Sequence, residues 1–233
     1  MKLARIRLGT LILVMAGALA LVGCAPGRSD APSPNGARSA ETTSITELAK
    51  VQVREYKGKK LGSIEDFREN SIKGPQVVDL KTYRLKITGE VTTPTVMTYA
   101  EILAYPAYEK DVTLNCIEGW SVDILWRGVR LRDLLDRAGV KPTAKTVIFH
   151  GADGYTTSLP LDFVVRKNLL LAYKMNGVDL PTERGYPFQV VAESKYGYKW
   201  AKWVTEIELS KDANYRGYWE KRGYDNKADF PGE

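Results

Sequence analysis

Apolar and polar residues alternate with the period of a β-strand in several segments after residue 80. In YRLKITGEV the alternation runs from Tyr83 to Thr88, which predicts a half-buried strand that ends at Gly89. Four further segments predict strands: TVIFH, LLLAYKMNG, PFQVVAES and VTEIELS. The dipeptides Asp153-Gly154 and Asn176-Gly177 predict hairpin turns within this set.

Helical periodicity is less frequent. VRLRDLLDRAGV places apolar residues from Leu131 to Ala138 on one face and ends at Gly139, which predicts an amphipathic helix with a glycine C-cap. Thr98 lies three residues before Glu101, the spacing of a capping box, and predicts a helix start. Strands outnumber helices and show no repeating βαβ order, so the pattern predicts an α+β domain dominated by β-sheet.

Two elements are expected before this region. Val51, Val53 and Tyr56 indicate a first strand, because apolar residues recur at short intervals among polar ones. The segment SIEDFREN begins with Ser63 and Asp66 at capping-box spacing and predicts a short helix or a turn.

The N-terminus carries an export pattern. Three basic residues precede a run of apolar and small residues from Leu8 to Gly23, which is too short for a membrane span and indicates a secretory signal. Leu21-Val22-Gly23-Cys24 resembles the lipobox of bacterial lipoproteins, in which Cys24 becomes an acylated N-terminus. The alternative is an ordinary signal peptide with an incidental Cys24. We expect an exported protein, lipid-anchored to a bacterial membrane at its periplasmic or extracellular face.

The rest of the chain divides by composition. Residues 1–23 are the expected signal peptide, and residues 24–44, rich in Pro, Ser, Gly and Ala, predict a flexible tether. Residues 45–210 are expected to form one domain with a full core. Residues 211–233 are aromatic, polar and punctuated by glycine, and are expected to wrap over that domain as a tail.

Charge favours an anionic ligand only weakly. The formal net charge is +6 and falls to +3 when Lys2, Arg5 and Arg7 are removed with the signal peptide. No cluster of Lys and Arg resembles a nucleic-acid arm, so we expect no nucleic-acid partner.

Cys116 is the residue with the most informative chemistry. The chain has two cysteines, and lipidation of Cys24 would leave Cys116 without an intramolecular partner. Such a thiol is buried and inert, paired between chains, reactive, or a metal ligand. Zinc, c-type haem, dinucleotide, ATP and Gly-x-Ser-x-Gly patterns do not occur in the sequence. A nucleophile pair of Cys116 with the only histidine, His150, is a less favoured alternative.

The sequence around Cys116 resembles a known family. CIEGWSVDILWRGVRLRDLL, DGYTTSLPL and GYPFQVVAESKYGYKWAKWVTEIEL resemble the molybdopterin-binding domain of the sulfite oxidase family. The resemblance is greatest to the branch that contains the catalytic subunit of the periplasmic methionine-sulfoxide reductase, and it covers roughly Val77 to Ser210. It implies a mixed, barrel-like sheet fold and a Mo-molybdopterin cofactor, with the Cys116 thiolate as metal ligand beside the two sulfurs of the pterin dithiolene.

The resemblance also implies roles for other residues. The segment Lys199-Trp200-Ala201-Lys202 would hold the pterin phosphate and tail by side chain and backbone. The remaining implied cofactor contacts are Asn70, His150 and Gly151, together with Arg184 near Gln189. Trp120, Trp200 and Trp203 would wall the cofactor or belong to the core.

Three departures from the family pattern bear on function. Sulfite oxidases carry an arginine shortly after their cysteine, where this chain has Glu118-Gly119-Trp120, so sulfite is in doubt as substrate. Gln189 stands where the reductase branch has an arginine, and an amide makes no charged bidentate phosphate contact. Exported members usually carry twin arginines, whereas Arg5 and Arg7 are separated here.

Two function classes follow. The favoured one is a molybdenum oxidoreductase that transfers an oxygen atom to or from a small S-oxide or oxyanion. Because no haem or iron–sulfur motif occurs, its electrons would pass through a separate cytochrome or quinone-linked membrane protein. The other class is a binding or interaction module that keeps the fold with an empty or differently filled pocket.

Overall fold

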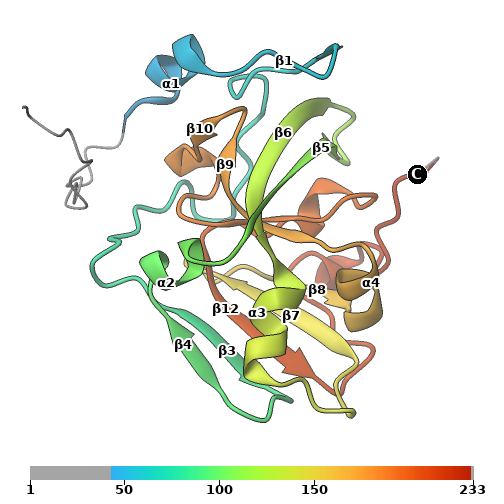
Figure 1. Cartoon of the computed structure of the whole chain (residues 1–233). Helices are drawn as coiled ribbons and strands as arrows, with labels where there is room; N and C mark the ends of the chain where they lie inside the picture. The colour runs from blue at the N-terminus through green and yellow to red at the C-terminus, as the bar shows by residue number, and fades with distance from the viewer. Residues whose placement is uncertain (1–42, 232–233) are drawn as a thin grey trace, which may run out of the picture. The chain divides into compact units, whose positions relative to one another are not determined.

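The computed structural model describes residues 43–231, and all of them belong to one compact unit. Figure 1 shows two sheets stacked with a few short helices around them. The helices are α1 (Ile45–Val51), α2 (Tyr99–Leu103), α3 (Leu131–Ala138), α4 (Leu161–Arg166) and the 3-10 turns η1 (Thr182–Arg184), η2 (Gly197–Lys199) and η3 (Glu220–Arg222). The strands are β1 (Glu55–Tyr56), β2 (Lys59–Lys60), β3 (Leu85–Gly89), β4 (Thr95–Met97), β5 (Ala107–Asn115), β6 (Ser121–Arg130), β7 (Thr146–Gly151), β8 (Thr156–Pro160), β9 (Leu170–Met175), β10 (Val178–Asp179), β11 (Gln189–Val191) and β12 (Val204–Ser210).

Besides the small antiparallel pair β1-β2, the structure has two five-stranded sheets, which differ in how their strands pair. The first has the order β10-β9-β6-β5, with β11 added antiparallel to β9. The second has the order β4-β3-β12-β7-β8 and is mixed, because β12 runs parallel to β3 and antiparallel to β7. The prediction of a β-rich α+β fold with a mixed sheet is therefore confirmed.

Local sequence signals explain most of these elements. Thr98 and Glu101 form the expected capping box at the start of α2. Helix α3 buries its leucine face and ends at Gly139, which has a left-handed conformation (φ 69°). Both predicted hairpin turns connect neighbouring strands, Asp153-Gly154 between β7 and β8 and Asn176-Gly177 between β9 and β10.

The predicted first strand is wrong. Residues 45–51 form helix α1 instead, and its N-cap Ser44 accepts a hydrogen bond from the backbone N–H of Glu47. Val51 is 73% exposed and Val53 41% exposed, so their spacing does not reflect a face packed on the core. Tyr56 does lie in a strand, the two-residue β1.

The segment that begins at Ser63 is a turn rather than a helix. The backbone N–H of Ser63 donates to Asp66 Oδ2 (2.6 Å), and Ser63 Oγ accepts from the N–H of Glu65. Only one of the two side-chain contacts of a capping box therefore forms, because the N–H of Asp66 donates to the Ser63 carbonyl (3.1 Å) and not to its Oγ, and no helix continues from this turn.

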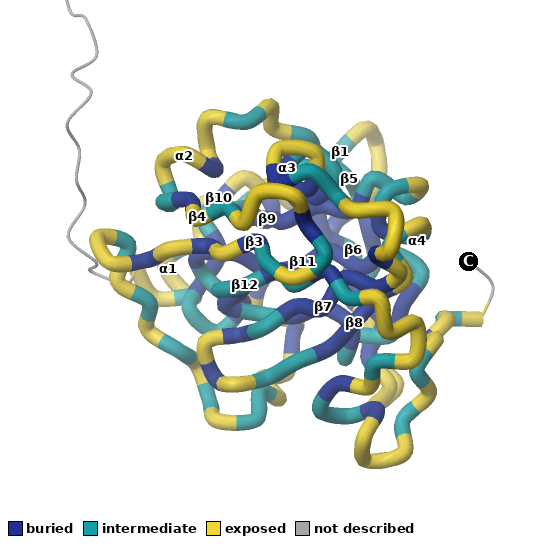
Figure 2. The backbone as a smooth tube through the Cα atoms, turned by 90° about the horizontal axis from the view of Figure 1, so that it is seen from below, coloured by how far each residue is buried: buried dark blue, intermediate teal, exposed yellow. Residues whose placement is uncertain are grey.

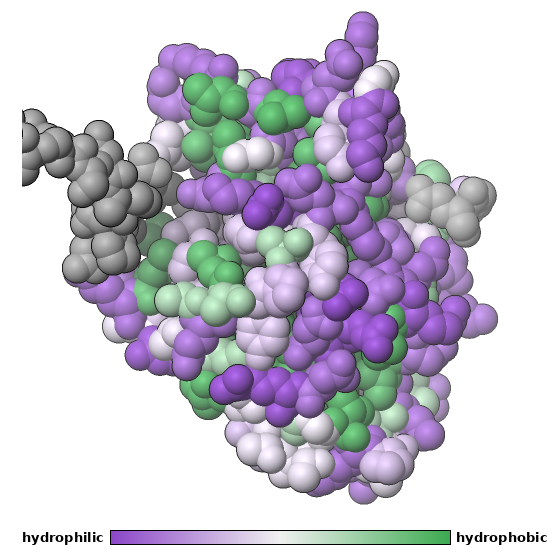
Figure 3. Space-filling model, viewed as in Figure 1, coloured by the Kyte–Doolittle hydropathy of each residue, from purple (hydrophilic) through white to green (hydrophobic). Residues whose placement is uncertain are grey.

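The buried core lies in the central strands of both sheets. Figure 2 shows this concentration of buried backbone, and strands β7 and β9 are buried at all but one position each. On the face seen in Figure 3, hydrophobic residues gather in separate small patches within a largely hydrophilic surface. Within residues 43–231, no helix is both long enough and apolar enough to cross a membrane.

Gly89, at the end of β3, is required by its surroundings. Its φ is +79°, and an added Cβ would lie 2.0 Å from the carbonyl oxygen of Leu209 in β12. We expect Gly89→Ala to lower the free energy of unfolding by about 3 kcal/mol, from left-handed strain and a backbone clash. Gly74→Ala is the matched control, because Gly74 has a similar φ of +76° and no atom within 4 Å of the added Cβ.

The control should therefore cost only about 1–2 kcal/mol, the strain of the left-handed conformation. Urea denaturation of both variants measures the difference. Equal losses in the two variants would contradict the close packing of β3 against β12.

Candidate functional site

Cys116 lies in the loop that connects β5 and β6, the longest hairpin of the protein. The backbone N–H of Cys116 donates to the carbonyl of Trp120 (2.8 Å), and Gly119 N–H donates back to the Cys116 carbonyl (3.0 Å). The loop residues 116–120 are therefore held tightly, and the side chain of Cys116 is only 7% exposed. Burial raises the pKa of its thiol, and the nearby Glu118 carboxylate raises it further, against backbone hydrogen bonds that lower it.

A second loop, residues 194–203, which we call the lysine loop, packs directly on this cysteine. Tyr196 pairs with Asn115 in a parallel bridge, and a Cβ on Gly197 would lie 3.8 Å from the Cys116 Cα. Trp200 packs against Trp126 of β6, with 5.6 Å between ring centroids. Two segments far apart in the sequence thus meet at the thiol, as the paired motifs imply.

Two cavities share Cys116 in their lining. The larger has a volume of about 140 Å³ and the smaller about 50 Å³. Five residues line both of them: Asn70, Cys116, Gly197, Trp200 and Lys202. Asn70 Nδ2 lies 3.8 Å from the Cys116 Sγ, so an amide donor faces the sulfur at this junction.

The smaller cavity is cationic and polar. Arg184, 7% exposed, lines it together with Gln189 and Arg68. One guanidinium nitrogen of Arg184 donates to the Phe67 carbonyl (3.0 Å), whereas its Nε is buried without any hydrogen-bond partner. Burial lowers the pKa of Arg184, partly offset by Glu69 and Glu183. A buried guanidinium edge with a free donor suits an anionic or acceptor-rich ligand.

Lys202 connects the two cavities. Its ammonium lies 2.8 Å from Glu69 Oε2 and also donates to the Glu183 carbonyl (3.2 Å). Burial lowers the pKa of Lys202, and Glu69 opposes this shift. Burial raises the pKa of Glu69, but hydrogen bonds from Lys202 and Ser71 outweigh it and lower the pKa overall. The pair is neutral overall and places the Lys202 ammonium, bound to the Glu69 carboxylate, at the shared edge of both cavities.

The larger cavity is mainly aromatic and carries two acidic side chains. Its lining includes Tyr155, Tyr198, Trp203, Trp219 and Tyr224, with Glu118 and Asp153 at the acidic positions. The hydroxyl of Tyr155 donates to the Tyr198 carbonyl, and burial raises its pKa well above the ordinary value. Aromatic walls with carboxylates favour a neutral or cationic organic ligand over a small anion.

Sequence reasoning missed most of this aromatic lining. Tyr155 lies within DGYTTSLPL, one of the segments that resemble the family, so its position was a usable signal. Trp219 and Tyr224 come from the tail, where no motif indicated a role in the cavity.

The structure brings eight of the residues predicted for the site to the two cavities. Asn70, Cys116, Trp200 and Lys202 line both cavities, and Arg184 and Gln189 line the smaller. Trp203 lines the larger cavity, and Trp120 lines the smaller. Ala201 is fully buried, and its carbonyl accepts from the N–H of Val190, which ties the lysine loop to β11.

Three predicted residues are placed differently. His150 lines neither cavity, and its Nε2 lies 2.9 Å from Glu208 Oε2 on the neighbouring strand β12. Gly151 also lies outside both linings, although a Cβ there would be 2.8 Å from the Lys202 carbonyl. Lys199 is fully buried and its ammonium contacts Glu220, so it does not present a free charge to an anion.

The residues around Cys116 fit a molybdopterin. Of the four buried side-chain polar atoms without a hydrogen-bond partner among the described residues, two belong to the cavity linings, Arg184 Nε at the smaller cavity and Ser71 Oγ at the larger. Both would gain a partner from a ligand rich in oxygen and nitrogen acceptors. The Cys116 thiol, which lines both cavities, is a soft donor that could ligate the metal of such a cofactor. Asn70, Arg184, Gln189 and Lys202 are the residues that could hold the pterin.

Comparison with known proteins agrees with this geometry. Residues 72–219 match the family model described as the oxidoreductase molybdopterin binding domain. An uncharacterized oxidoreductase of Bacillus subtilis is 38% identical over 156 residues, which cover 66% of this chain and 78% of that protein. A protein of Azospira oryzae, named as a protein-methionine-sulfoxide reductase subunit, is 31% identical, with 63% and 56% covered.

More distant relatives share a part of their length with this chain. The mitochondrial sulfite oxidase of Rattus norvegicus is 29% identical, and the match covers 68% of this chain and 34% of that protein. The sulfane dehydrogenase SoxCD from Paracoccus pantotrophus shares the fold, with a TM-score of 0.59 at 23% identity over 79% of this chain and 57% of that one. The matched family model spans more than half of the chain, and the chain therefore belongs to the family of oxidoreductases with a molybdopterin-binding domain.

Proposed function

We propose that this protein is an exported, lipid-anchored enzyme that transfers an oxygen atom at a molybdenum–pterin centre ligated by Cys116, with an organic S-oxide as substrate. The observation that carries the proposal is the position of Cys116, at the junction of a cationic cavity and an aromatic one. The cationic side suits the pterin with its phosphate, and the aromatic side suits an organic substrate.

Each side of the site has a distinct role in this proposal. When bound, the molybdenum cofactor supplies the change of oxidation state that accompanies oxygen-atom transfer. Cys116 provides the thiolate ligand, and Asn70 donates toward its sulfur. Arg184 offsets negative charge of the pterin, whereas Lys202, which is paired with Glu69, adds a polar contact at the shared edge. The aromatic side chains limit the access of water to the substrate side.

The choice of an S-oxide over an oxyanion rests on charge. Glu118 and Asp153 line the larger cavity, where they repel a small anion such as sulfite. Lys202 also lines it, but its charge is paired with Glu69. A sulfoxide is neutral, and its organic substituents can pack on the tyrosine and tryptophan rings.

Anchoring and electron supply complete the proposal. Cys24 lies outside the described residues, and its sequence context supports acylation. A lipid anchor would keep the enzyme near a cytochrome or a quinone-linked membrane protein that supplies electrons.

Turnover of the full-length, molybdenum-loaded protein tests this function. A dye-coupled assay should show reduction of aryl methyl sulfoxides and no measurable oxidation of sulfite. Tyr155→Phe keeps the aromatic ring in the cavity lining, so a change of turnover in this variant reports the role of the hydroxyl and not that of ring packing. A loaded protein that oxidises sulfite faster than it reduces any sulfoxide would contradict the proposed substrate class.

Glu118→Gln tests the charge argument on its own. Loss of one like charge at the cavity edge is worth on the order of 1 kcal/mol, so inhibition by sulfite or sulfate should strengthen about fivefold. The KM for a neutral sulfoxide should stay unchanged. Glu65→Gln is the matched control, because Glu65 is exposed and lines neither cavity. Equal anion inhibition in Glu118→Gln and in the control would contradict electrostatic exclusion.

A further inference from the structure

The C-terminal tail forms part of the larger cavity. Trp219 and Tyr224 both line it, and their rings lie 5.1 Å apart. The ring of Tyr224 also meets that of Tyr198 edge-on, with 5.3 Å between centroids. The family match ends at residue 219, so Tyr224 is a feature of this chain outside the matched domain.

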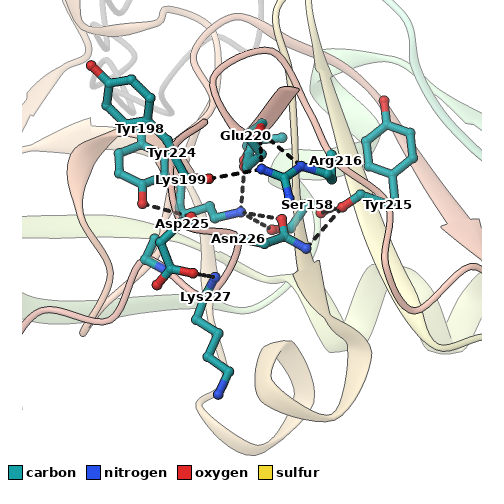
Figure 4. Close-up of polar contacts among 12 residues, drawn as sticks. Ser158, Tyr198, Lys199, Tyr215, Arg216, Glu220, Tyr224, Asp225, Asn226 and Lys227 are labelled. Carbon is teal, nitrogen blue, oxygen red and sulfur yellow. Dashed lines mark hydrogen bonds and ion pairs between the residues drawn. The ribbon is translucent and has the colours of Figure 1, made fainter. Parts of the chain in front are cut away.

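A buried ion pair fastens the tail to the lysine loop. Lys199 Nζ lies 2.5 Å from Glu220 Oε1, and both side chains are fully buried (Figure 4). Lys199 also donates to the Ser158 carbonyl and to Asn226 Oδ1, and Glu220 accepts from Thr157 Oγ1. One lysine thus joins the tail at two points to strand β8.

The contacts with the rest of the domain extend along the tail. A Cβ on Gly217 would lie 2.2 Å from the Thr156 carbonyl oxygen, so the tail backbone packs directly on β8. The N–H of Tyr196 donates to the Ala228 carbonyl (2.9 Å), and Phe230 N–H donates to the Ser194 carbonyl (3.0 Å). The tail is therefore held against β8 at one end and against the loop that packs on Cys116 at the other.

We infer that residues 217–230 form a fixed outer wall of the larger cavity and limit the size of the molecules that reach Cys116 through it. Trp219 and Tyr224 are the wall residues that meet the incoming molecule. Lys199 and Glu220 line neither cavity and act as positioning residues that hold this wall in place. This size limit goes beyond the proposed function, because it concerns access to Cys116 whichever substrate is converted there.

The reactivity of Cys116 with two maleimides of different size tests the wall. The full chain is prepared metal-free with Cys24→Ser, so that Cys116 is its only thiol. N-methylmaleimide and N-pyrenylmaleimide share one electrophile, so the ratio of their rate constants cancels changes in the thiolate fraction. In the otherwise unchanged chain the wall should slow the pyrenyl reagent far more than the methyl reagent.

Tyr224→Ala and Trp219→Ala should raise the pyrenyl-to-methyl rate ratio about tenfold or more, the change expected when a barrier of roughly 1.4 kcal/mol is removed. Tyr224→Phe should keep the original ratio, because the ring remains. Lys221→Ala is the matched control, since Lys221 is an exposed tail residue outside the cavity lining. Glu220→Gln should also raise the ratio, because loss of the ion pair with Lys199 displaces the wall.

Circular dichroism first confirms that each variant is folded. If Glu220→Gln does not fold, Tyr224→Ala and Trp219→Ala still test the inference. An unchanged ratio in both alanine variants would overturn the inference. An equal rise of the rate ratio in Lys221→Ala would also overturn the inference, because it would show that any substitution in the tail loosens it. The assay needs no molybdenum, so its outcome is independent of the proposed function.

Discussion

Glu220→Ala is expected to lower the free energy of unfolding by about 3–5 kcal/mol, the largest stability effect of any single substitution considered for this protein. Glu220 and Lys199 are both fully buried, and the substitution leaves the Lys199 ammonium without its charged partner. Two neutral acceptors remain for it, the Ser158 carbonyl and Asn226 Oδ1. Neutral acceptors do not replace a carboxylate in the protein interior.

Two controls separate this explanation from a simple loss of packing. The double variant Lys199→Met with Glu220→Leu removes both charges and should recover most of the lost stability, because apolar side chains can replace a buried pair. Asp162→Ala breaks the exposed pair with Arg166 and should change stability by less than about 1 kcal/mol. Urea denaturation measures all three. A double variant no more stable than Glu220→Ala would contradict the argument from charge.

Cys116→Ala is expected to abolish oxygen-atom transfer, with activity at least about 100-fold lower, since loss of an outer-shell partner alone typically costs 10–100-fold at metal sites. The fold should remain intact, because the side chain is small and alanine can occupy its place. Turnover with an aryl methyl sulfoxide, measured per folded protein, gives the result.

Asn70→Ala is the matched comparison for Cys116→Ala. Asn70 Nδ2 faces the same sulfur at 3.8 Å but is not expected to bind the metal. Its removal should lower activity by roughly 10-fold, as for a partner that orients a ligand. Cys116→Ala with activity equal to that of Asn70→Ala would show that the thiol is not a metal ligand.

The strands and caps were predictable because their signals are local. Alternating residues from Tyr83 to Thr88 predict β3, and the capping box at Thr98 predicts the start of α2. Helix α1 was missed although Ile45, Leu48 and Ala49 have helical spacing, because the spacing of Val51 and Val53 imitates a strand although both are exposed. Exposure is a property of the folded chain and cannot be read from spacing alone.

The site was predictable where the resemblance supplied it. The family motifs located Cys116, Asn70 and Lys202, and the structure brings them to one junction. Lys199 shows the limit of such reasoning. Two lysines in a glycine-containing loop suggested a shared anion site, yet Lys199 is neutralised by Glu220, which lies 21 residues later in the tail. No local pattern reveals a partner at that separation.

The aromatic lining of the larger cavity was not predictable for the same reason. It combines side chains from the β7–β8 hairpin, the lysine loop and the tail, so no single segment carries its signature. The two acidic residues of this cavity gave no signal of their role. In the sequence, Glu118 is only a departure from the sulfite oxidase pattern, and Asp153 is only part of a turn.

Ligation of molybdenum by Cys116 is tested most directly by X-ray absorption at the molybdenum edge. The samples are the protein purified from the membranes of its own host and the Cys116→Ser variant. We expect near-stoichiometric molybdenum in the wild-type protein, with one more sulfur ligand than in the variant. An equal sulfur count in the two proteins, or a wild-type protein without molybdenum, would contradict the proposed centre.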